Sequence, residues 1–248
     1  MHETDVATLA ATSTLPVVRH QLQHREGLRA WVSDDATAYV VQQRRPWDGG
    51  LALWLLGDTD ALGPLAAAVA AQHGVPHRVL VEERAREAVP APWRPVRSRT
   101  WHWMSTREAP PAPRHPVVDL GPDDDTEVSA FLDEAYPGTF ARPGTDGVEG
   151  WSAVRDEKGI LAVGCVVRQD DGTGYLRGVS VFPARAGEGL GGAVSARLTA
   201  RAQAGASGLA SLGVFVENGP ALAVYRRLRY EVGHTFVAGV PAGAAEGA

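Results

Sequence analysis

The most constraining feature of the chain is a glycine-rich segment that follows a run typical of a buried β-strand. Val179 and Val181 alternate with smaller residues, a pattern that favours a pleated strand, and Pro183 ends the strand because proline has no amide to donate. Four glycines then stand within six positions: Gly187, Gly189, Gly191 and Gly192. Apolar residues recur every fourth position after them, which predicts an amphipathic helix ending near Gly205.

Glycines at the start of a helix allow a ligand to approach the backbone closely. The amides of the first helical turn lack intrahelical partners and carry the positive end of the helix dipole, so the segment predicts an anion site, most naturally for phosphate. The alternative is a flexible surface turn before an ordinary helix. So many glycines make a helix start unfavourable, which argues against that alternative.

The composition excludes several other classes of protein. The 248 residues, 44% of them hydrophobic, are enough for one large or two modest globular domains. A formal charge of −5 without a lysine-rich run argues against a nucleic-acid partner. Cys165 is the only cysteine, which fits a reducing cytoplasm, and we expect no signal peptide, no membrane partner and a cytoplasmic location. His20 and His24 share a helical spacing, but without a third ligand we expect no metal site.

Hydrophobic patterning predicts an α/β chain of the α+β type, with helices flanking a mixed, mostly antiparallel central sheet. Strands are expected at 27–32, 37–42, 51–56, 77–82, 99–105, 117–120, 151–155, 161–168, 175–182, 209–216 and 230–240. Helices are expected at 15–24, between Asp58 or Thr59 and Gly74, from 123 to 132, after the glycines, and at 221–228. Residues before 15 are expected to be loose.

The segment 107–116 contains four prolines and is the best candidate for a domain boundary. We therefore predict an N-terminal domain at 1–112, a catalytic domain at 113–240, and a disordered tail at 241–248 that frays.

Gly187, Gly189 and Gly192 also satisfy the dinucleotide pattern GxGxxG, and Glu217 ends the next strand, where a ribose acceptor could sit. An NAD(P)-binding enzyme is therefore an alternative. However, few residues remain after Glu217 for further strand–helix units, and the strands before the loop are linked as hairpins. Pro183 also makes a wider turn than this fingerprint uses.

Two motifs together resemble the GNAT family of acyl-CoA-dependent N-acyltransferases, over roughly residues 115–240. The first is strand–Pro–x–x–x–Gly–x–Gly–x–Gly, from Val179 to Gly191. The second is Asn–x–x–Ala–x–x–x–Tyr, which begins at Asn218, contains Tyr225, and is followed by Arg229 and Tyr230. The chain departs from the family pattern at two positions.

The family usually has Arg or Gln immediately before the first loop glycine, where this chain has Ala186, with Arg185 one position early. A cradle of backbone amides does not need that side chain. Arg229 replaces a common glycine after the second helix, which affects a turn more than the chemistry.

The resemblance implies the acyl-CoA N-acyltransferase fold and acetyl-CoA as the acyl donor. Val179, Ser180 and Val181 would pair with the pantetheine arm. The pyrophosphate would be held by the amides of Ala186, Gly187, Glu188, Gly189, Leu190, Gly191 and Gly192. Asn218 would contact the cofactor near its sulfur, and Tyr225 would protonate the departing thiolate. The first half resembles the family weakly and would be a degenerate, second GNAT-like domain.

The expected chemistry is consistent with these roles. An amine that attacks a thioester forms an oxyanion, which a strand amide can stabilise. A tyrosine with an ordinary pKa of about 10 stays protonated at neutral pH and can donate to a thiolate. The alternative for Tyr225 is a core aromatic residue on its helix.

The general base is left open among Glu217, Asp133, Glu134 and Tyr136, and an ordered water could serve instead. The acceptor would lie against the loop that holds Tyr136 and Phe140, with Glu217 nearby; the alternative is a packed surface loop. The leading hypothesis is an acetyl-CoA-dependent N-acetyltransferase that acts on a small-molecule or peptide primary amine by direct attack in a ternary complex. The second is a non-catalytic acyl-CoA-binding regulatory protein, because Ala186 departs from the family and no base is clear.

Overall fold

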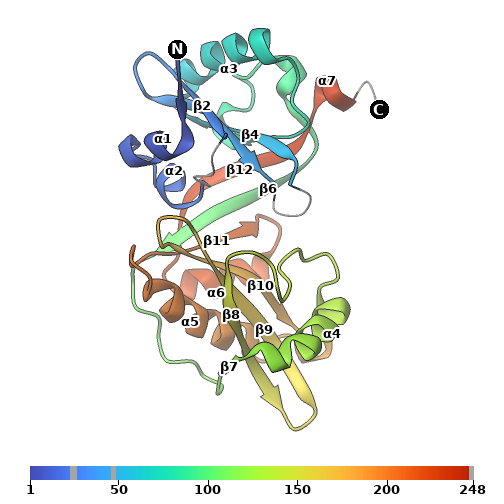
Figure 1. Cartoon of the computed structure of the whole chain (residues 1–248). Helices are drawn as coiled ribbons and strands as arrows, with labels where there is room; N and C mark the ends of the chain where they lie inside the picture. The colour runs from blue at the N-terminus through green and yellow to red at the C-terminus, as the bar shows by residue number, and fades with distance from the viewer. Residues whose placement is uncertain (23–26, 46–48, 246–248) are drawn as a thin grey trace. The chain divides into compact units, whose positions relative to one another are not determined.

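The chain forms two units with separate hydrophobic cores. Figure 1 shows the helices and strands of the computed structural model, which describes residues 1–22, 27–45 and 49–245. Unit 1 comprises Met1–Trp103 and Gly233–Ala248, and unit 2 comprises Met104–Val232. Among the described residues, no helix is both long and apolar enough to cross a membrane. His24 lies outside the described residues, which contain no cluster of three potential metal ligands.

Unit 1 is a sheet with one long helix packed into its core. Its elements are β1 (His2–Asp5), α1 (Val6–Thr12), α2 (Pro16–His20), β2 (Arg29–Val32), β3 (Ala38–Arg44), β4 (Leu51–Gly57), α3 (Thr59–His73), β5 (Val79–Glu82), η1 (Glu83–Ala85), η2 (Ala91–Trp93), β6 (Pro95–Thr106), β12 (Glu231–Pro241) and α7 (Ala242–Ala245). The strand order is β1-β2-β3-β4-β5-β12-β6, with β4 and β5 parallel. Asp58 caps α3, and Leu62, Leu65 and Val69 on one side of α3 are buried in the core of unit 1.

The elements β1 and α1 replace the loose start that the sequence predicted. Asp5 caps α1 by accepting a hydrogen bond from the Thr8 amide, and Leu9 of α1 is buried. The strand β1 contains no alternating apolar residues, which is why the sequence did not predict it, and it is held by antiparallel pairing with β2.

Unit 2 is a mixed sheet with helices on both faces. Its elements are β7 (Val118–Leu120), η3 (Pro122–Asp124), α4 (Asp125–Ala135), β8 (Val148–Asp156), β9 (Gly159–Arg168), β10 (Gly174–Val181), η4 (Pro183–Arg185), α5 (Leu190–Gln203), β11 (Ala210–Phe215) and α6 (Gly219–Arg227). The strand order is β11-β10-β9-β8-β7, in which only β10 and β11 pair in parallel. The helices α5 and α6 share one core with the sheet, while α4 packs in a second core with Trp151 and Val163. The prediction of a mixed, mostly antiparallel sheet flanked by helices is confirmed.

The unit boundaries differ from the expected domain boundaries. The strand β12 was assigned by sequence to the domain 113–240, but Phe236 and Val237 pair with Glu82 and Val81 of β5 in unit 1. Part of the expected disordered tail forms the short helix α7, and residues 246–248 lie outside the described chain. The unit boundaries fall inside β6 and β12, so each of these strands has residues in both units.

Candidate functional site

The glycine segment forms the connection between β10 and α5 that the sequence predicted. The strand ends at Val181, a 3₁₀ turn follows at Pro183–Arg185, and α5 begins at Leu190. Gly187 and Gly189 have φ angles of 90° and 84°, which only glycine adopts without strain. The sequence of this loop therefore has glycine where the backbone conformation requires it.

The loop is open to a ligand along its backbone. Residues 186–189 are exposed, and a Cβ atom built on Gly187 or Gly192 would meet nothing within 4 Å. Gly189 is the N-cap of α5 and has no side chain with which to cap the first-turn amides. Leu190 is buried and fixes the start of the helix in the core. The loop thus presents amides and a helix dipole to its outer side.

An ion pair inside the loop neutralises its charged side chains. Arg185 donates from Nε to Glu188 Oε1 at 2.7 Å and from a terminal nitrogen to Oε2 at 2.7 Å. The hydrogen bond raises the pKa of Arg185 and lowers the pKa of Glu188. The ring nitrogen Nε2 of His115 also lies 3.0 Å from the Glu188 carbonyl oxygen. Arg185 therefore already has a partner within the loop. His115 was not indicated by any sequence motif.

The strand that enters the loop separates from its parallel neighbour. β10 and β11 pair only from Gly174 to Leu176 with Ala210 to Leu212, although β10 continues to Val181 and β11 to Phe215. On its other edge β10 carries a β-bulge between Arg177 and Ser180, where Gly178 has a φ angle of 62°. Over Val179–Val181, the described strands show no ladder between β10 and β11. The sequence predicted this strand but not the bulge or the separation.

Tyr225 lies in the core that α5 and α6 share, with 8% of its surface exposed. Burial raises its pKa to about 12, and neighbouring Tyr175 contributes in the same direction. The ring of Tyr225 lies 5.7 Å from the ring of Tyr230, whose hydroxyl is 2.9 Å from Thr199 Oγ1. The hydroxyl of Tyr225 therefore stays protonated at neutral pH. This protonation state is expected both for a proton donor and for a tyrosine that only packs in the core.

Both ends of α6 are capped, and these caps fix the position of Tyr225. Asn218 is the N-cap and accepts a hydrogen bond through Oδ1 from the Ala221 amide at 3.2 Å, which leaves its side-chain nitrogen able to donate elsewhere. At the other end Arg229 has a φ angle of 63°, and the amide of Tyr230 donates to the Tyr225 carbonyl. This is a Schellman motif, with Arg229 where glycine is usual.

The remaining predicted residues are only partly brought together. Phe140 lies under the guanidinium of Arg177 on β10, at 4.7 Å from ring centroid to Cζ. Tyr136 and Glu217 are exposed, one at the end of α4 and the other in the turn after β11. Among the candidate bases, Asp133 pairs with Arg142 at 2.7 Å and Glu134 is exposed. No sequence motif indicated Arg177.

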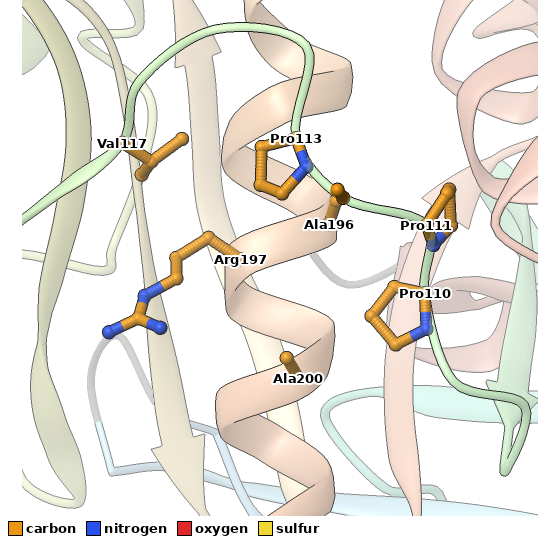
Figure 2. Close-up of a pocket in the computed structure, with 8 residues that line it drawn as sticks. Pro110, Pro111, Pro113, Val117, Ala196, Arg197 and Ala200 are labelled. Atoms are coloured by element: carbon orange, nitrogen blue, oxygen red, sulfur yellow. The ribbon is translucent and has the colours of Figure 1, made fainter.

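A cavity of about 370 Å³ lies elsewhere in unit 2, over the outer side of α5. The proline segment lines it with Pro110, Pro111 and Pro113, and the helix with Ala196, Arg197 and Ala200. Figure 2 shows the Arg197 side chain extending away from the prolines, on the side of Val117. Arg197 forms an ion pair with Asp119. None of the predicted acetyl-CoA contacts lines this cavity.

The model of the Acetyltransferase (GNAT) family matches residues 97–230. A GCN5-related N-acetyltransferase from Sphaerobacter thermophilus superposes with a TM-score of 0.58 and 18% identity, covering 94% of this chain and 88% of that one. A GCN5-related N-acetyltransferase from Kribbella flavida superposes with a TM-score of 0.55 and 16% identity, covering 94% of each chain. A tandem GNAT protein from the clavulanic acid biosynthesis pathway superposes with a TM-score of 0.51 and 14% identity, covering 94% of this chain and 91% of that one. No curated protein matches the chain by sequence.

Proposed function

Because the chain belongs to the GNAT acetyltransferase family, we propose that it transfers an acetyl group from acetyl-CoA to the primary amine of a small molecule or peptide. The observation that carries the proposal is the separation of β10 from β11 immediately before the glycine loop. An open strand edge followed by uncapped helix amides suits a ligand that joins an extended amide-containing arm to a diphosphate.

In this proposal each part of the connection has one binding role. The backbone of Val179–Val181 pairs with the pantetheine arm, and the amides from Ala186 to Gly192 hold the pyrophosphate. Asn218 contributes its side-chain nitrogen near the thioester. Acetyl-CoA supplies the activated acetyl group. Since Arg185 pairs with Glu188, the loop would hold the pyrophosphate with backbone amides rather than with a free arginine.

Tyr225 is the proposed proton donor to the departing thiolate. Its hydroxyl is protonated at neutral pH, and it lies on α6 beside the helix that the glycine loop opens. The amine acceptor attacks directly while both substrates are bound, and a strand amide of β10 stabilises the oxyanion that develops. A bound water or one of the acidic side chains at the acceptor loop takes the proton from the amine.

Unit 1 would be a GNAT-like domain that does not bind acetyl-CoA. It repeats a parallel strand–helix–strand order in β4, α3 and β5, but β4 and β5 remain paired up to Leu55 and Val81. The Asp58 carboxylate accepts from the Asp60 and Ala61 amides at the start of α3, so it occupies the position that an anion would need. A cytoplasmic location, expected from the single cysteine, is part of the proposal.

A non-catalytic acyl-CoA-binding protein is the second candidate, because Arg185 is engaged and the described residues leave no assigned base. Both candidates bind acetyl-CoA, so calorimetry alone does not distinguish them. Thiol release with acetyl-CoA and a broad amine panel does. Turnover supports the transferase, and binding without turnover supports the regulatory protein. The absence of any acetyl-CoA binding would refute both.

A further inference from the structure

We propose that Arg177 binds a carboxylate group of the acceptor, so that the acceptor is a primary amine that also carries a carboxylate. The inference rests on the proposed function, because it names the substrate class of the same site. The first observation behind it is a buried donor on Arg177 that has no partner in the described part of the chain. The Nε atom of this half-buried side chain is buried and forms no hydrogen bond with any described residue.

Other partly buried arginines of unit 2 have acidic partners. Arg142 pairs with Asp133 at 2.7 Å, and Arg168 pairs with Glu149 at 2.5 Å. No described carboxylate forms an ion pair with Arg177. A buried guanidinium donor that lacks a partner is unfavourable, and an anion held by the terminal nitrogens of the same guanidinium would offset that cost.

Two aromatic rings hold the Arg177 guanidinium. Its Cζ lies 4.7 Å from the ring centroid of Phe140 and 5.0 Å from that of Tyr175. Contacts with aromatic faces stabilise the cation and orient its plane, while the N–H groups at the edge remain available. A planar fork of donors matches the two oxygens of a carboxylate better than it matches a neutral group.

The position of Arg177 connects it with the proposed acetyl-transfer site. It directly precedes the bulge glycine Gly178 and the strand segment proposed to pair with the pantetheine arm. Tyr175 lies close enough to Tyr225 to raise the pKa of its hydroxyl. Phe140 comes from the loop predicted to hold the acceptor. A carboxylate on Arg177 would therefore hold the amine beside the reacting thioester.

The test compares matched acceptors on the full chain with acetyl-CoA. Free amino acids and the corresponding amino-acid amides differ in the carboxylate but keep the amine, and thiol release gives kcat/KM for each. We expect the wild type to prefer the free acids. A charged hydrogen bond of about 1.5–3 kcal/mol corresponds to roughly a 10–150-fold loss of kcat/KM for the acids in Arg177→Gln. Turnover of the amides should change less than about threefold, because they lack the carboxylate whose interaction is lost.

Arg197→Gln is the matched control, because it also removes one positive charge from unit 2 and should keep the preference. Acetyl-CoA affinity and melting temperature show that each variant is folded. Should Arg177→Gln not fold, Arg177→Lys retains the charge without the fork and should show a partial loss. A wild type that does not distinguish acids from amides, or an Arg177→Gln enzyme with the wild-type preference, overturns the inference.

A binding measurement separates failure of this inference from failure of the proposed function. Amino-acid binding to the CoA-loaded protein is followed by calorimetry in the wild type and in Arg177→Gln. Binding that depends on Arg177 without thiol release would refute the transferase and keep the carboxylate site. Turnover of amines that does not depend on Arg177 would support the transferase and refute the carboxylate site. If carboxylate-bearing amines neither bind nor react, the carboxylate site is refuted.

Discussion

Tyr225 shows how burial of a single side chain bears on the proposed chemistry. Burial raises the pKa of its hydroxyl to about 12, so the proton remains in place throughout the physiological range. A protonated hydroxyl beside a departing thiolate is an acid, whereas the same hydroxyl in a closed core only fills space. The two roles predict different kinetics.

Tyr225→Phe should lower kcat by about 10²–10⁴-fold if the hydroxyl acts as the general acid. The affinity for acetyl-CoA should be unchanged, because the substitution leaves the loop and β10 intact. Steady-state thiol release and calorimetry give the two quantities. Tyr230→Phe is a suitable control, since it removes a buried hydroxyl that bonds to Thr199 and should affect stability rather than kcat. An unchanged kcat in Tyr225→Phe would assign this residue to the core alone.

A second buried polar group lies in unit 1, where Glu82 ends β5. Its carboxylate accepts a hydrogen bond from His234, and Arg84 Nε donates to it at 2.9 Å. Burial alone would raise the pKa of Glu82, but His234 and Arg84 together outweigh this effect and hold the pKa below its ordinary value. The folded state therefore binds a proton at this carboxyl less readily than the unfolded state.

It follows that Glu82 stabilises the fold at neutral pH and loses this effect in acid. The contribution is complete above the ordinary glutamate pKa of about 4.3 and disappears as pH falls through the lowered pKa. Glu82→Gln should reduce the free energy of unfolding at pH 7 by about 1–3 kcal/mol, because it removes the charged acceptor of the buried His234, whereas the exposed Arg84 remains solvated. Urea unfolding from pH 7 to pH 3 checks both points. A variant whose stability falls in acid as steeply as that of the wild type would contradict this account.

At the scale of the element, the glycine loop depends on backbone conformations that other residues adopt only with strain. Gly189→Val should abolish acetyl-CoA binding, since a side chain at a φ angle of 84° both strains the loop and covers the amides. Gly74→Val provides the control, because Gly74 has a φ angle of 71° at the end of α3 and, like Gly189, no atom close enough to clash with an added Cβ. Both variants should lose stability, but only Gly189→Val should lose binding in calorimetry. Retained binding would remove the loop from the cofactor site.

The Schellman motif at the end of α6 makes a further prediction. Arg229 adopts a left-handed conformation that costs a non-glycine residue about 1–2 kcal/mol. Glycine at this position loses about 0.5–1 kcal/mol in conformational entropy, so Arg229→Gly should stabilise the protein by roughly 0.5–1 kcal/mol. Arg229→Ala keeps the strain and should give no such gain. Chemical denaturation measures the difference, and equal stability of the two variants would count against the strain.

Local conformational signals determine which elements could be predicted from the sequence. Pro183 and the glycines after it act within a few residues, so the strand, loop and helix α5 were located closely. The bulge at Gly178 was not predicted, because it depends on the register with β9. For β1, antiparallel pairing with β2 replaces any apolar alternation. Arg177 carries no motif, and its importance emerges only when its three-dimensional neighbours are known.

At the scale of the whole chain, β12 pairs with a strand, β5, that lies far from it in the sequence. It follows unit 2 in sequence but lies between β5 and β6 in unit 1. Phe236 of this strand is fully buried and packs its ring 5.2 Å from Trp54 and 5.0 Å from Trp101. No periodicity in the sequence could show which strand β12 would pair with, since the pairing spans about two thirds of the chain.

Phe236→Ala should destabilise unit 1 by about 3–5 kcal/mol, the usual effect of removing a buried phenyl ring. Hydrogen exchange should show the loss of protection first in β5, which pairs with β12. The loop and α5 in unit 2 serve as the internal reference. Equal loss of protection at β5 and α5 would mean that the two units unfold together.

The position of β12 also bears on the order in which the protein is made. A ribosome delivers residues from first to last, and N-terminal domains commonly fold while later ones are still being synthesised. Here β5 must wait for its neighbour until every residue of unit 2 has emerged. The half of the protein that is translated first is therefore the half whose sheet is completed last, and until then an unpaired edge at β5 is open to chaperones or to misassembly with another nascent chain.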